Sequence, residues 1–157
     1  MQVQTRLSRR PTLRFYNREL HMSAAFFIVL DREDVGVDTM VNGKFLSQNA
    51  KALEAIAESL GIRPLEAWVS YSPEEARAIM EEMGTDPDEI DNLNLPEQSW
   101  YEPQEGLDWV NTVSTHVRAN PASLENPEGV LEDLEEYRTV LEQAKAVGAR
   151  WNLQVDF

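Results

Sequence analysis

Two short apolar segments lie far apart in the chain, and each has the pattern of a β-strand. Residues 24–30, AAFFIVL, form an unbroken apolar run whose aromatic and β-branched side chains are typical of a fully buried strand. Residues 150–156 alternate instead, with Trp151, Leu153 and Val155 separated by polar residues, as in a strand with one buried face. We expect the two segments to pair in one small sheet.

Between these segments, apolar residues recur at helical spacing. The best-marked helix follows Ser72, which is a predicted N-cap, with Pro73 at the first position, Glu75 completing a capping box and Gly84 ending the helix. The other predicted helices cover residues 47–60, 64–68, 103–119 and 127–147, with one further turn after residues 86–87. Four to five helices packed on one face of a small sheet make an α+β fold.

Residues 38–46 allow two interpretations. Asn42-Gly43 is a strong signal for a β-hairpin, because both residues tolerate the positive φ of a type I′ turn. The alternative is a plain loop leading into a helix that Ser47 would cap. The pattern of apolar residues alone leaves both open.

Length and composition indicate a single domain without covalent or metal cross-links. The chain has 157 residues, 42% of them apolar, which is enough for one core. It contains no cysteine, which excludes disulfide scaffolds, thiolate zinc sites and cysteine nucleophiles. The lack of cysteine also fits a reducing compartment, so we expect a cytoplasmic protein.

Charge divides the chain into two parts. Residues 1–21 hold five Arg and one Glu, a net of +4, whereas the whole chain has a net charge of −14, so residues 22–157 carry −18. A basic head before an apolar run resembles an export signal or a transit peptide. The run is too short to span a membrane, however, and the acidic DRED motif follows it with no cleavage pattern. We therefore predict a basic extension, either disordered or laid on the acidic body, followed by one acidic domain at 22–157.

An acidic body repels phosphate and attracts cations. We therefore expect no binding to nucleic acid or anionic membranes, and the sequence contains no phosphate-binding glycine loop, serine-hydrolase motif or zinc-protease motif. These features favour a non-enzymatic module that binds another protein. One example is an inhibitor or immunity-type partner of a basic protein. The alternatives are a small enzyme and a self-associating structural protein, such as a homodimer.

The best candidates for a binding site lie in the acidic, irregular connection at residues 84–102. The carboxylates of this connection would attract a basic protein, or would merely keep the loop solvated. Its two adjacent aromatic side chains would serve as interface anchors. These candidates are Asp86, Asp88, Glu89, Asp91, Trp100 and Tyr101.

Weaker candidates for chemistry lie elsewhere. Asp108 and His116 recur on one face of a predicted helix, where a carboxylate near an imidazole would suit a general base. Residues 31–42 resemble a calcium-binding loop at first. However, Val35 stands where that pattern needs a side chain with an oxygen ligand, and Asn42 stands where it needs a glutamate. We therefore expect no metal site and no cofactor.

Overall fold

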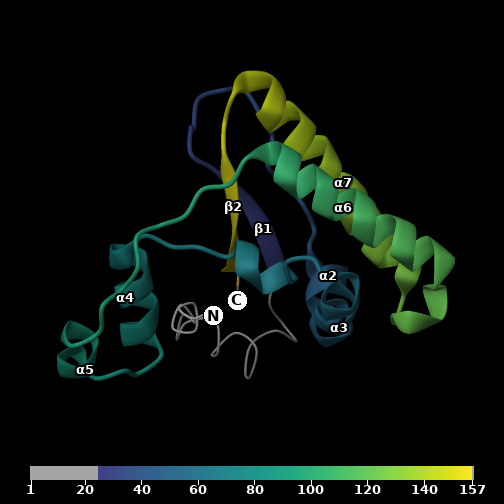
Figure 1. The fold of residues 1–157 in the computed structure, drawn as a ribbon. Helices are drawn as coiled ribbons and strands as arrows, with labels where there is room; N and C mark the ends of the chain where they lie inside the picture. Colours follow the sequence, from purple (N-terminus) through teal and green to yellow (C-terminus); the bar gives the residue numbers. More distant parts are fainter. Residues whose placement is uncertain (1–24, 157) are drawn as a thin grey trace.

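The two predicted strands lie side by side at the centre of the molecule (Figure 1). The structure is a computed structural model and describes residues 25–156, so the predicted basic extension lies outside the described residues. β1 (Ala25–Leu30) and β2 (Trp151–Asp156) form a two-stranded antiparallel sheet. With helices between the strands, this confirms the predicted α+β fold.

One face of the sheet supplies much of the hydrophobic core. Residues that lie opposite each other in an antiparallel pair point to the same face. The side chains that share the core face are all less than one-tenth exposed, and they are Phe26, Ile28, Leu30, Trp151, Leu153 and Val155.

β2 is buried more completely than its alternating pattern predicts. Its second edge carries an isolated bridge from Val69 and another from Tyr101, so β2 has neighbours on both sides. On its other face the polar residue Asn152 is also buried, and its amide donates a 2.9 Å hydrogen bond to the carbonyl of Ser99. Neighbours from distant parts of the chain thus bury a residue that strand periodicity predicts to be exposed.

Helices fill the chain between the strands. Most of the predicted boundaries are confirmed to within a residue or two, because caps and prolines mark them locally. In order, the elements are α2 (Lys44–Gln48), α3 (Ala50–Leu60), the 3₁₀ helix η3 (Leu65–Trp68), α4 (Pro73–Glu82), α5 (Pro87–Asp91), α6 (Pro103–Ala119), the 3₁₀ helix η4 (Pro121–Ser123) and α7 (Pro127–Val147).

The long helices α6 and α7 lie to one side of the two strands and α4 and α5 lie to the other, while α2 contacts both α7 and α3 (Figure 1). The long helices α6 and α7 pack against each other along their length, and their inward residues belong to the main core. On the other side, α4 and α5 pack against each other and extend away from the long helices. We call residues 72–99 the α4–α5 lobe.

The hairpin predicted near residues 38–46 is wrong, and the alternative of a loop before a helix is correct. Gly43 does adopt a positive φ of 67°, but as the N-cap of α2 and not within a turn between strands. Asp133, on α7, accepts hydrogen bonds from the N–H groups of Phe45 (2.9 Å) and Leu46 (3.1 Å) in the first turn of α2. A partner 87 residues away therefore fixes the start of this helix.

The helix predicted to start at Ser47 is instead two helices. Ser47 lies inside α2, and the break falls at Asn49, between α2 and α3. The Asn49 side chain donates to the carbonyls of Phe45 and Glu125 and accepts from the N–H of Glu125. The helical spacing of apolar residues continues across the break, which is why the sequence pattern misses it.

None of the helices within residues 25–156 combines the length and the apolar character that crossing a bilayer requires.

Candidate functional site

The α4–α5 lobe contains all four acidic residues predicted to form a binding site. Ser72 and Glu75 form the predicted capping box at the start of α4, with reciprocal hydrogen bonds of 3.1 and 3.0 Å. Asp86 caps α5 by accepting a 2.9 Å hydrogen bond from the N–H of Asp88. The helix dipole stabilises negative side chains in the first turn of each helix. Some acidic residues of the lobe therefore have a structural role at the start of a helix.

One arginine compensates part of the negative charge of the lobe. Arg77 lies 3.2 Å from a carboxylate oxygen of Glu81 and 2.7 Å from one of Asp91, and so ties α4 to α5. The carboxylates of Asp91 and Glu81 raise the pKa of the Arg77 guanidinium above its already high ordinary value. Among the described residues, no cation lies within ion-pair distance of Asp88 or Glu89.

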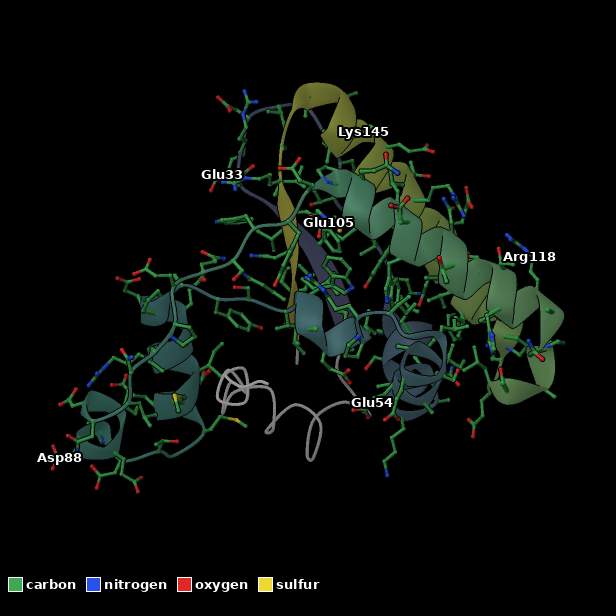
Figure 2. All side chains as sticks on the ribbon, viewed as in Figure 1. Glu33, Glu54, Asp88, Glu105, Arg118 and Lys145 are labelled. Carbon is green, nitrogen blue, oxygen red and sulfur yellow. The ribbon has the colours of Figure 1, made fainter. Side chains whose placement is uncertain are left out.

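Asp88 lies at the outer end of the lobe, with its side chain directed away from the sheet (Figure 2). Asp86, Asp88, Glu89 and Asp91 are all exposed. The structure therefore brings the four predicted acidic residues together on one short helix and its cap, although two of them also have local structural roles.

The two predicted aromatic anchors differ from each other. Tyr101 is half-buried and bridges β2 through its backbone, its ring packs edge-on against Trp68 at 5.0 Å, and its hydroxyl donates to the carbonyl of Ala67. These contacts give Tyr101 a role in the core of the protein. Trp100, the next residue back along the chain, is also half-buried.

The structure does not bring Asp108 and His116 together. Eight residues along a helix correspond to roughly 12 Å, and the two side chains line different hollows. Asp108 is exposed and accepts a 2.8 Å hydrogen bond from Gln104. His116 is half-buried in a hollow that also includes Leu60 from the end of α3. Their separation removes the geometric basis for a shared acid–base role.

An aromatic corner beside η3 is a feature that the sequence does not indicate. The guanidinium carbon of Arg63 lies 4.3 Å from the ring centroid of Trp68 and 4.8 Å from that of Tyr101. The Arg63 carbonyl accepts a 2.6 Å hydrogen bond from the Trp109 indole. These residues come from three separate segments of the chain, so no local pattern could have grouped them.

Two carboxyl groups are buried inside the described part of the protein. Burial raises the pKa of Asp133, although the backbone N–H groups of Leu46 and Phe45 act in the opposite direction. Burial also raises the pKa of Glu66, in η3, and the nearby charge of Glu54 adds to the effect. Within residues 25–156, no group of three or more His, Asp and Glu side chains is placed to hold a metal ion.

Comparison of the chain with protein-family models, with curated proteins and with solved structures finds no match.

Proposed function

We propose that this chain is a non-enzymatic cytoplasmic protein that binds a basic partner protein through its α4–α5 lobe. The observation that carries the proposal is the charge of the lobe, because residues 72–99 hold nine Asp and Glu side chains and one Arg. A concentrated negative field speeds the encounter with a cationic partner and selects against anionic ones.

The position of the lobe supports this function. Since α4 and α5 extend away from the long helices, a partner could approach their acidic face without disturbing the main core (Figure 1). The lobe also keeps charges that Arg77 leaves uncompensated, most clearly on Asp88 and Glu89. Leu93, at 39% exposure, offers a small apolar contact among them.

A charge-reversal experiment tests the proposal with an octa-arginine peptide as the probe. The variant Glu82→Lys/Asp88→Lys/Glu89→Lys leaves intact both the Asp86 cap and the Arg77 ion pairs. Three reversed exposed charges should weaken binding by about tenfold at low salt, since each surface pair is worth about 0.5 kcal/mol.

The matched control changes the same net charge on a different surface. Glu128→Lys/Glu132→Lys/Glu142→Lys alters three exposed residues of α7 and should weaken binding by less than about threefold. The proposal is wrong if both triple variants weaken binding equally. It is also wrong if raising the salt from about 50 to 500 mM leaves the affinity of the unmodified chain unchanged.

A further inference from the structure

Arg63 marks a place where aromatic rings and a carboxylate hold a cation at the protein surface. Its guanidinium lies over both Trp68 and Tyr101, at 4.3 and 4.8 Å from the ring centroids. One guanidinium nitrogen lies 3.9 Å from a carboxylate oxygen of Glu105, at the outer limit for an ion pair. The negative face of an aromatic ring attracts a cation, and a nearby carboxylate adds to that attraction. The chain thus fills a cation-binding corner with its own side chain.

A hollow of about 310 Å³ opens beside this corner. The indole rings of Trp68 and Trp109 line it, and its charged residues are Arg63, Glu105 and Asp108. Two carboxylates against one guanidinium leave the lining with a net negative charge. The volume is at the lower end of the range for ligand pockets and suits a single side chain.

The ion pair of Arg63 with Glu105 is long and exposed to solvent, whereas the Arg63 backbone is anchored. The side chain is 39% exposed and that of Glu105 is 51% exposed, so solvent weakens their interaction. The backbone is anchored separately, by the hydrogen bond from the Trp109 indole to the Arg63 carbonyl. The guanidinium can therefore leave the aromatic corner while the loop that carries it stays in place.

We propose that this hollow receives an arginine or lysine side chain of a partner protein, which takes the place of Arg63 against Trp68 and Tyr101. Glu105 and Asp108 supply the counter-charges for the incoming cation. No residue of the α4–α5 lobe lines the hollow. The site therefore goes beyond the proposed function, and a small cation can test it separately.

The first test titrates the full chain with N-acetyl-arginine methylamide while following its four tryptophan indole N–H signals by NMR. Saturable shifts at Trp68 and Trp109, with affinity in the millimolar range typical of a single side chain, are the expected result. The neutral isostere N-acetyl-citrulline methylamide should leave both signals unmoved. Equal shifts with both compounds, or no saturation with arginine, would overturn the proposal.

Variants of single residues distinguish displacement of Arg63 from the general effect of removing one positive charge. Arg63→Gln empties the corner and should tighten binding of the arginine probe by about fivefold, whereas Asp108→Asn should weaken it by a few fold. Lys51→Gln removes the same charge from an exposed residue of α3 that does not line the hollow. It should change the affinity by less than about twofold. If Arg63→Gln and Lys51→Gln tighten binding equally, the hollow is not a site that Arg63 occupies, whatever the result at the α4–α5 lobe.

Discussion

Gly43 lies against the backbone of Phe26, and the contact leaves no room for a side chain. A Cβ on Gly43 would overlap the carbonyl oxygen of Phe26 and lie only 3.1 Å from its carbonyl carbon. Gly43 also has a φ of +67°, which L-residues with a Cβ rarely adopt. The start of α2 is thus fitted to the edge of β1 through one glycine.

Gly43→Ala should therefore be among the most destabilising single-methyl substitutions in the chain. Left-handed strain and overlap with fixed backbone together predict a loss of about 3 kcal/mol in the free energy of unfolding, measured by urea denaturation. Gly36→Ala is the matched control, because Gly36 has a similar φ of +76° but nothing within 4 Å of its Cβ position. The control should lose only about 1 kcal/mol of stability. Equal losses in the two variants would show that backbone strain, and not the overlap with Phe26, causes the loss in Gly43→Ala.

The sequence predicted best those features whose causes lie within a few residues. Ser72 and Glu75 mark the start of α4 because their capping box is complete within four residues. The hairpin prediction failed because Asn42-Gly43 indicates only a positive φ, and both a turn and a helix N-cap can use it. The contacts of the α2 start with Phe26 and Asp133, which favour the N-cap, are distant in sequence.

The candidate sites show the same contrast between features set by neighbours in sequence and features set by distant residues. The acidic residues of the lobe could be predicted as a group because they are neighbours in sequence. The corner around Arg63 could not, because Trp68, Tyr101 and Trp109 reach it from separate elements. The ring contacts of Tyr101 with Trp68 and Trp151 could not be predicted either, because both partners are distant in sequence.

Asn49 should be needed for the break between α2 and α3. Its buried side chain makes three hydrogen bonds, two of them to the backbone of Glu125. Asn49→Ala would leave those backbone groups unpaired, so we expect a loss of about 2–4 kcal/mol by thermal or urea unfolding. Asn42→Ala provides a comparison, because the exposed Asn42 side chain accepts one local bond, from Lys44, and should cost less than about 1 kcal/mol. A loss of similar size in both variants would contradict the role of Asn49.

Asp133 should hold the start of α2 through its two backbone hydrogen bonds. Asp133→Ala leaves the N–H groups of Phe45 and Leu46 without their acceptor and should cost about 2–4 kcal/mol. Hydrogen exchange at those two amides should accelerate in this variant, whereas Asp133→Asn, which keeps an acceptor oxygen, should largely preserve their protection. Glu132→Ala, at the adjacent exposed position, should leave the exchange of both amides unchanged.

Glu66 should make the stability of the protein depend on pH in the direction opposite to that of a salt-bridged carboxylate. Burial raises its folded-state pKa above the ordinary 4.5, so the folded state holds this proton more tightly than the unfolded chain does. Its contribution to stability is then fully present below pH 4.5 and is lost as the pH rises through the raised folded-state pKa. Above that pKa the folded protein carries a buried carboxylate that accepts a hydrogen bond from the Glu66 backbone N–H, and no salt bridge to it is found among residues 25–156.

Glu66→Gln replaces the buried carboxylate by a neutral amide of nearly the same shape, and so removes the free-energy cost of burying the charge. The variant should be more stable than the unmodified protein at pH 7, by about 0.5–2 kcal/mol, and the gain should vanish near pH 4. Thermal unfolding across this pH range measures it. Glu58→Gln, at an exposed position of α3, should give no comparable gain at either pH. A gain from Glu66→Gln that persists undiminished at pH 4 would mean that packing, and not the buried charge, is responsible.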